Sequence, residues 1–308
     1  MKEKLVIGTR GSKLALWQAN YIADCLRSQF PGVEVSLKRV MTTGDKILDV
    51  PLARIGGKGL FTKELETEML TGQIDLAVHS LKDMPTELPP GLTLAAITER
   101  VDPGDAFISP KYKTVDALPQ GAKVGTSSLR RKAQLLNYRP DLVISDLRGN
   151  LDTRLQKLET EQLDAIILAV AGLKRLGWQE RITQVLPPSL CLPAVGQGAL
   201  AIETRSDDAE VIGMLEFLNH DSTRAAVTAE RSFLREVEGG CQVPVGVFGQ
   251  ANSNSLLLEA VILSVDGVQV IRDTVSGTWA EAEELGRALA QKMLAAGGRE
   301  IMAALECM

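Results

Sequence analysis

The sequence contains few cysteine, histidine and aromatic residues. Among 308 residues there are four cysteines and two histidines, and aromatic residues make up only 4%. The cysteines are far apart and form no C-x-x-C pair, which argues against a disulfide framework and against a zinc site. His79 and His220 are too isolated for a metal site or a catalytic triad. We therefore expect free thiols or thiol derivatives, structural histidines and no bound metal.

Long apolar runs and an excess of positive charge are also absent. No segment has the roughly 20 apolar residues that a membrane-spanning helix needs. The net charge of −5 gives no overall field that would attract nucleic acid or an anionic membrane. The residues after Met1 lead directly into a strand-like segment, without the apolar stretch of a secretory signal. We expect a soluble, cytoplasmic and monomeric protein that binds neither nucleic acid nor membrane.

What is present is an alternation of strand-like and helical patterns. Three times in the first half, a short β-branched run ends in polar or glycine residues and leads into an amphipathic helix. The runs are at 5–8, 122–125 and 142–145, and the first helix should extend from about Lys13 to Gln29 with Leu14, Trp17, Tyr21 and Leu26 on its apolar side. This pattern predicts mostly parallel sheets whose ligands lie beyond the carboxyl ends of the strands.

A chain of this length exceeds the size, about 250–300 residues, at which a single hydrophobic core stops growing. Asp102-Pro103-Gly104 marks a crossover between two α/β lobes, and 193–198 has the features of a return crossing. After Asp221 the pattern changes to strands at 243–250, 255–265 and 268–274, followed by helices broken at Gly297-Gly298. We predict an α/β fold of two lobes and a small α+β C-terminal domain, with bounds 1–98 plus 199–216, 104–192 and 221–308.

Basic residues gather at or near the predicted strand ends. There, guanidinium groups would lie beside the free N–H groups of helix amino termini, which suits carboxylate or phosphate. A single such arginine is more often a surface residue. Several together repel one another unless an anion joins them, which favours a polyanionic ligand. The residues are Arg10, Arg130, Arg131, Arg148, Arg154 and Arg175.

Asp83 and Cys241 are the residues best placed for chemistry. Asp83 should emerge at the carboxyl edge of a strand, between Lys82 and Pro85, where it acts either as a functional carboxylate or as a turn cap. Cys241 follows Gly239-Gly240, which allow another group to approach the sulfur closely. A lone cysteine is more often a small buried hydrophobe, an interpretation that suits Cys25 better.

The segment around Lys58 resembles a phosphate-binding loop only superficially. That motif would need glycine at position 52 and serine or threonine at position 59, where this chain has Leu52 and Gly59. Nucleotide binding by that mechanism is excluded. The glycines predict instead a mobile loop, about 42–60, that could cover a cleft.

Five blocks of sequence together resemble the porphobilinogen deaminase family. They are 77–85, 124–131, 147–150, 192–198 and 230–246, and the resemblance runs through nearly the whole chain. It implies two lobes folded like type II periplasmic binding proteins and a third domain carrying a dipyrromethane cofactor, joined by a thioether to Cys241. It also implies a transferase of porphyrin and heme biosynthesis. Four porphobilinogens would be condensed head to tail, with loss of ammonia, and hydroxymethylbilane released by hydrolysis.

The resemblance also implies roles for individual residues. Asp83 matches the essential carboxylate, which would stabilise the cationic methylene-pyrrolenine left when ammonia departs and could move protons between steps. Two departures are Lys13, where many members have proline, and Thr43, where several have arginine. Positions on the cofactor side are Lys82, Asp83, Thr126, Ser128, Arg130, Arg131, Arg148 and Arg154. Positions on the substrate side are Arg10, Ser12, Lys58, Arg148, Arg154 and Arg175.

Two other classes of protein compete with this interpretation. A non-catalytic solute-binding or effector-sensing protein for a polycarboxylate could share the two-lobed fold and the arginines, because a fold alone does not specify turnover. The missing export signal and Cys241 count against it. A phosphate-handling transferase would need a metal, and the sequence offers no convincing carboxylate cluster to bind one.

Overall fold

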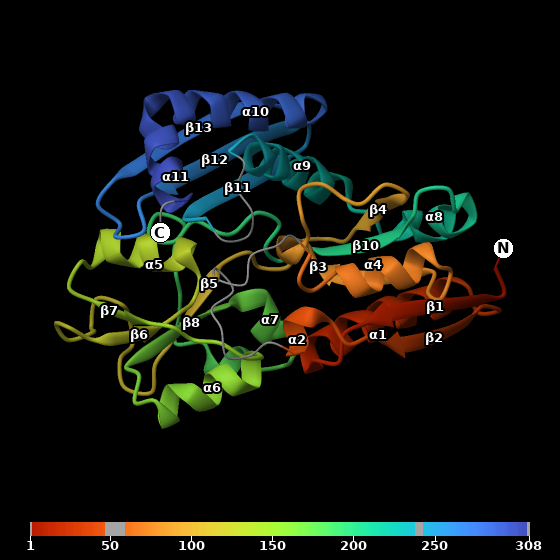
Figure 1. Cartoon of the computed structure of the whole chain (residues 1–308), viewed down its shortest axis with the longest axis horizontal. Coiled ribbons are helices and arrows are strands. Elements are labelled where there is room, and N and C mark those ends of the chain that lie inside the picture. The colour runs from red at the N-terminus through yellow and green to blue at the C-terminus, as the bar shows by residue number, and fades with distance from the viewer. Residues whose placement is uncertain (1, 47–58, 238–242, 307–308) are drawn as a thin grey trace.

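The computed structural model describes residues 2–46, 59–237 and 243–306 (Figure 1). Lys58, Cys241 and most of the predicted loop at 42–60 lie outside the described residues. The described chain forms three sheets, which Figure 1 shows at the right, the lower left and the upper left.

The first sheet has the strand order β2-β1-β3-β10-β4. β1 runs parallel to β2 and β3, whereas β10 runs antiparallel to β3 and β4, so four strands point one way and β10 opposes them. The predicted mostly parallel sheet is confirmed. The strands are β1 (Lys4–Thr9), β2 (Glu34–Arg39), β3 (Leu76–Ser80), β4 (Leu92–Ile97) and β10 (Leu200–Arg205).

Alternating side chains of this sheet pack helices on both of its faces. Leu5 and Ile7 face the cluster that includes α1 and α8, while Val6 between them packs on the α4 side. The helices are α1 (Lys13–Gln29), α2 (Thr43–Lys46), α4 (Lys63–Leu70) and α8 (Ala209–Leu215), with short turns η1 (Leu81–Asp83) and η3 (Glu216–Leu218). We call this sheet and its helices lobe 1.

Lobe 2 repeats the pattern with the strand order β7-β6-β8-β5-β9, in which β5 is the opposed strand. Its strands are β5 (Asp105–Ile108), β6 (Lys123–Gly125), β7 (Val143–Ser145), β8 (Ala165–Ala169) and β9 (Gln184–Val185). Its helices are α5 (Leu129–Tyr138), α6 (Leu151–Thr160) and α7 (Val170–Arg175), with η2 (Gln179–Arg181). The strand-to-helix units predicted around Arg130 and Arg154 are therefore confirmed.

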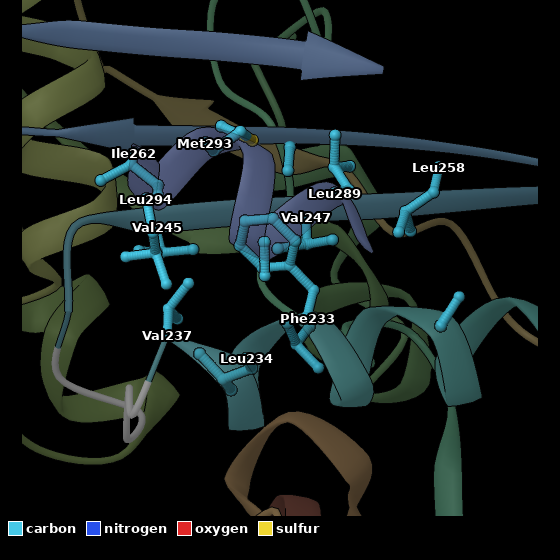
Figure 2. Close-up of a cluster of buried hydrophobic side chains, with 14 of the residues drawn as sticks. Phe233, Leu234, Val237, Val245, Val247, Leu258, Ile262, Leu289, Met293 and Leu294 are labelled. Carbon is cyan, nitrogen blue, oxygen red and sulfur yellow. The ribbon is translucent and has the colours of Figure 1, made fainter. Parts of the chain in front are cut away.

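The C-terminal part is an antiparallel sheet packed against helices. Phe233 on α9 and Leu289 on α10 meet Val247 and Leu258 of the sheet in one buried cluster (Figure 2). As predicted, the last helical segment is broken at Gly297, whose φ of 110° lies in the left-handed region. The elements are α9 (Asp221–Glu236), β11 (Val245–Asn252), β12 (Ser255–Leu263), β13 (Val270–Thr278), η4 (Trp279–Glu281), α10 (Ala282–Met293), η5 (Leu294–Gly298) and α11 (Arg299–Glu306).

The bounds predicted for α1 are correct and Leu26 is buried as predicted, but Trp17 and Tyr21 do not belong to its buried face. Its buried side is formed by small and aliphatic residues, among them Ala19, Ile22 and Leu26. Trp17 and Tyr21 are 37% and 45% exposed. Alanines let the helix approach the sheet closely, so the large rings occupy a neighbouring stripe.

The chain passes twice between the lobes, as predicted. It leaves lobe 1 after β4 and returns before β10. The crossings are hydrogen-bonded to each other, since the Gln197 side-chain amide donates to the Pro103 carbonyl at 2.6 Å and Arg100 Nε donates to the Gln197 carbonyl at 2.8 Å. None of the helices described is long and apolar enough to cross a membrane.

Candidate functional site

The predicted site residues meet between the lobes. β3 of lobe 1 ends at Ser80 and leads into η1, which carries Lys82 and Asp83, and β8 of lobe 2 leads into α7, which carries Arg175. A cavity of about 70 Å³ separates these segments. Its lining includes Ser80 and Lys82 from lobe 1, Arg131, Arg154 and Arg175 from lobe 2, and Gln197 from the return crossing. This agrees with a ligand site beyond the carboxyl ends of the strands.

Arg130 and Arg131 share one anion inside the protein. Asp105, fully buried at the start of β5, lies 2.6 Å from Arg130 Nη1 and 2.7 Å from Arg131 Nη2. Burial would raise the pKa of Asp105, but the two guanidinium groups hold it well below its usual range. One of the two positive charges is therefore balanced by a residue of the chain, and the contact of these arginines with a ligand stays a prediction.

Cys191 belongs to the same buried group. Its thiol donates to Asp105 Oδ2 at 3.3 Å. Burial raises the pKa of Cys191 to about 12, so the sulfur stays a neutral thiol at ordinary pH. Cys191 is therefore inert, in contrast to the role expected for Cys241.

Arg10 also has an internal partner. Its Nε donates to Asp45 Oδ1 at 3.1 Å, and its guanidinium carbon lies 4.1 Å from the centre of the Phe61 ring. Burial would raise the pKa of Asp45, but hydrogen bonds from Arg10 and Thr42 lower it below its ordinary value. A substrate carboxylate would have to take the place of Asp45 at Arg10.

Three cations remain without such compensation. Arg154 Nε donates to the Gly149 carbonyl at 2.8 Å and Arg175 Nη2 donates to the Gly198 carbonyl at 2.7 Å. Burial lowers the pKa of each arginine to about 10. Arg148 Nη1 is buried with no hydrogen-bond partner. Within the ranges that the structure describes, no carboxylate forms an ion pair with any of the three, so we call them the uncompensated cations. Buried polar groups of this kind call for a partner.

Lys82 and Asp83 face these cations from lobe 1. Lys82 Nζ donates to Gln197 Oε1 at 3.3 Å, and burial lowers the pKa of Lys82 to about 8 against the opposing effect of Asp83. Asp83 is exposed and near enough to Arg154 for its charge to raise the pKa of that arginine. No hydrogen bond found among the described residues uses the Asp83 carboxylate, as a turn cap would require.

The predicted hydroxyl groups serve the ends of helices. Ser12 Oγ accepts from Ala15 N at 3.2 Å and caps α1, and Ser128 Oγ accepts from Arg131 N at 3.4 Å and caps α5. Thr126 Oγ1 accepts from Ser128 N at 3.2 Å. Each hydroxyl can still donate its own hydrogen.

Sequence reasoning missed several polar residues of the site. Asp105 directly follows the predicted crossover at Asp102-Pro103-Gly104, Gln197 lies in the predicted return crossing, and neither they nor Ser80 were predicted as site residues. Ser80 accepts a hydrogen bond of 2.8 Å from the buried Gln18 side chain. The available signal was a polar residue in an otherwise apolar segment, such as Asp105 before Ala106-Phe107-Ile108.

No group of three His, Cys, Asp or Glu side chains that could hold a metal ion occurs in the described part of the chain. His79 is buried with its Nε2 3.1 Å from Glu203 Oε2, and His220 Nδ1 lies 2.9 Å from Thr223 Oγ1. The uncompensated cations and Asp83 are thus the chemically distinctive groups here. Fold and site together define an anion-binding protein with a cleft between two α/β lobes.

Comparisons with known proteins give the family. A family model described as porphobilinogen deaminase, dipyromethane cofactor binding domain, matches residues 5–213, and the model of the C-terminal domain of porphobilinogen deaminase matches residues 224–295. The chain belongs to the porphobilinogen deaminase family. The predicted family, activity and cofactor are thereby confirmed at the level of the family.

Individual relatives agree with this result. The porphobilinogen deaminase of Geotalea daltonii is 56% identical over 301 residues, which cover 98% of this chain and 94% of that protein. That of Desulforamulus reducens is 53% identical over 302 residues, covering 98% of both. Among solved structures, the methionine-binding protein MetQ has a TM-score of 0.45 at 16% identity, covering 70% of this chain and 89% of that one.

Proposed function

We propose that this chain acts as a hydroxymethylbilane synthase. It would condense four porphobilinogens head to tail, with release of ammonia at each addition, and release the linear tetrapyrrole by hydrolysis. The observation that carries this assignment is the placement of the three uncompensated cations of lobe 2 opposite Asp83 of lobe 1. A solute-binding protein for a polycarboxylate would also need the cations, but an exposed carboxylate beside them would repel such a ligand.

The residues fit a dipyrromethane whose side chains are carboxylates. The buried Arg148 Nη1 needs an acceptor, and Arg154 and Arg175 need an anion. Carboxylate oxygens satisfy both needs through charge-assisted hydrogen bonds. When bound, the cofactor supplies the pyrrole end on which the chain is extended. We assign its attachment to Cys241 and its carboxylates to Arg148, Arg154 and Lys82, with Thr126 and Ser128 nearby.

Arg130 and Arg131 take a different part in this assignment. Both are cofactor-side positions by resemblance, yet both hold Asp105. Arg131 also lines the cavity, and its charge lowers the pKa of Arg154. We propose that Arg130 anchors the start of α5 and that Arg131 adds positive potential to the cleft.

Asp83 is proposed as the catalytic carboxylate. The 3-10 turn η1 fixes its backbone directly after β3, and the carboxylate is free of internal hydrogen bonds within the described chain. A negative charge held there stabilises the positive charge that develops on the substrate as ammonia leaves. The carboxylate is also free to accept and return a proton.

On the substrate side we propose Arg10, Ser12, Lys58 and Arg175, together with Arg148 and Arg154. In this scheme Asp45 holds the Arg10 guanidinium in place until a substrate carboxylate replaces it. Arg175, anchored through the Gly198 carbonyl, binds a carboxylate at the return crossing. We also propose the division into domains 1–98 with 199–216, 104–192 and 221–308, and a monomer acting in the cytoplasm.

Intact mass under denaturing conditions tests the cofactor assignment. The wild-type chain should be heavier than its sequence by one dipyrrole unit, and Cys241→Ser should lack the increment. Cys25→Ser is the matched control, because Cys25 lies on α1 and outside the sequence block that contains Cys241, and it should keep the added mass. An unmodified wild-type protein that nevertheless converts porphobilinogen at full rate would disprove the assignment.

A further inference from the structure

Two aromatic side chains on α1 form a stack that the hydrophobic cores do not use. The rings of Trp17 and Tyr21 are 5.4 Å apart between centroids and nearly parallel, at 6°. Both are exposed, and neither belongs to the buried clusters that hold lobe 1 together. Among the described residues, Trp17 Nε1 donates no hydrogen bond. Large rings of this kind are usually found in a core or at a binding surface.

The stack continues a stripe that begins in the cleft. Leu14, Trp17 and Tyr21 are spaced three and four residues apart and so share one side of the helix. Leu14 lines the cavity between the lobes. The stripe therefore leads from the cavity wall outward to solvent.

Contacts with lobe 2 show that the start of α1 faces the cleft. Lys13 Nζ lies 3.1 Å from the carboxylate of Asp152 on α6. A Cβ atom placed on Gly172 of α7 would be 3.6 Å from Leu14 Cδ2. The first turn of α1, where the stripe begins, thus lies against lobe 2.

A cation within reach of the stack suits an aromatic carboxylate. Arg175, one of the uncompensated cations, and Glu99 are both close enough to Tyr21 for their opposite charges to act on the phenol, but of the two only Arg175 also lines the cavity. A flat ring with carboxylate side chains could lie against the two rings and extend a carboxylate toward Arg175. Stacking on exposed aromatic faces tolerates many ligands and contributes about 1–3 kcal/mol per ring elsewhere.

We propose that the Trp17–Tyr21 stack is an outer binding platform for porphobilinogen, which holds the pyrrole ring before the substrate passes to Arg175. This inference rests on the proposed function. The continuity of the stripe with the cavity, and the position of Arg175 within reach of both Tyr21 and the cavity, identify the occupant as the incoming substrate.

Steady-state and chain-length measurements test the platform. Trp17→Ala and Tyr21→Ala should each raise the KM for porphobilinogen about fivefold, corresponding to loss of the weakest stacking values, while kcat stays within twofold. Trp17→Leu keeps an apolar contact without a π face and should behave like Trp17→Ala, whereas Trp17→Phe should retain most of the wild-type KM. Tyr138→Ala removes an equally exposed tyrosine (46%) from α5 and should change neither parameter.

The possible outcomes separate this inference from the proposed function. A wild-type protein that does not consume porphobilinogen contradicts the function itself. Wild-type KM in Trp17→Leu and Tyr21→Ala, with normal turnover, overturns the platform alone. A normal first addition with slow later additions, seen by mass spectrometry of the loaded chains, would assign the stack to the grown product and also overturn the proposal. Thermal melting identifies any variant that fails to fold. In that case, the comparison of KM between Trp17→Leu and Trp17→Phe decides whether the aromatic face binds the substrate.

Discussion

Lobe 2 uses arginine in two different ways within a short distance. Arg130 and Arg131 share the buried Asp105, whereas Arg148, Arg154 and Arg175 have no ion pair in the described chain. Both groups lie in segments that follow strands: Arg130, Arg131 and Arg154 are in the first turns of helices, Arg148 precedes α6, and Arg175 ends the short helix α7. The position of an acidic residue, rather than the position of the arginine, separates a structural cation from one available to a ligand.

The strongest test of this difference is to remove the carboxylate of Asp105, which Arg130 and Arg131 share. Asp105→Asn leaves two buried guanidinium groups without an anion and should lower the free energy of unfolding by about 3–5 kcal/mol, measured by denaturant titration. Asp45→Asn weakens the partly exposed pair with Arg10 while its amide oxygen can still accept from Thr42, so it should cost about 1 kcal/mol or less. Equal effects of the two substitutions would contradict the distinction.

For a substitution of Asp83 we expect the opposite result, which is a lower turnover rate without a loss of folding stability. Asp83→Asn keeps the size of the side chain but removes the anion, so turnover should fall by about 10²–10³ while the melting temperature stays unchanged. Asp83→Glu should be intermediate. Single-turnover release of ammonia from porphobilinogen by cofactor-loaded protein provides the measurement. Near-normal release by Asp83→Asn would move the catalytic role to another carboxylate.

Truncating an uncompensated cation should weaken the interaction with the cofactor without lowering folding stability. Arg148→Leu removes a buried group that lacks a partner, so the free energy of unfolding of the cofactor-free chain should change by less than about 1 kcal/mol or rise. The dipyrromethane would lose one charged hydrogen bond, worth about 1.5–3 kcal/mol, so the cofactor-free chain should acquire its covalent cofactor roughly 10- to 100-fold more slowly. Arg131→Leu should lose stability as well. Cofactor occupancy by intact mass and denaturant titration distinguish the two variants.

The smallest expected effect is a pH dependence that originates at Lys82. Because burial lowers its pKa to about 8, the ammonium that helps to hold carboxylates is lost as the pH rises through 8, and turnover should decline by up to about tenfold. Folding stability should instead rise between pH 8 and 10.5, because the unfolded chain holds that proton longer. In Lys82→Arg the decline in turnover should move above pH 10. An unchanged pH profile would show that Lys82 does not contribute.

Local patterns predicted the elements of this fold, but not the partners across it. The start and end of α1, the helix break at Gly297 and the strand-to-helix units follow from neighbouring residues. The pairing of Arg130 with Asp105 joins residues 25 apart, and the Gln197–Asp105 contact joins residues 92 apart. Such contacts depend on how the two lobes and their crossings come together, which no short pattern records.

Local patterns also failed to predict which side of α1 is buried. Hydrophobicity favoured Trp17 and Tyr21 for the core, but the close approach of the helix to the sheet selected small residues there. The family resemblance carried information that local patterns lack, since it named Asp83 and the arginines together. The resemblance did not distinguish Arg130 from the arginines available to a ligand, because its partner Asp105 lies outside the five matching blocks of sequence.

The place of β10 also determines the order in which the chain can fold as it is synthesised. β10 bridges β3 and β4, yet it emerges from the ribosome only after all of β5 to β9. Lobe 2 can therefore complete its sheet from contiguous chain while the earlier strands still lack their central neighbour. Lobe 1, although its first strands are made earliest, should therefore complete its sheet after lobe 2, and the sides of β3 and β4 that pair with β10 stay unpaired until it arrives.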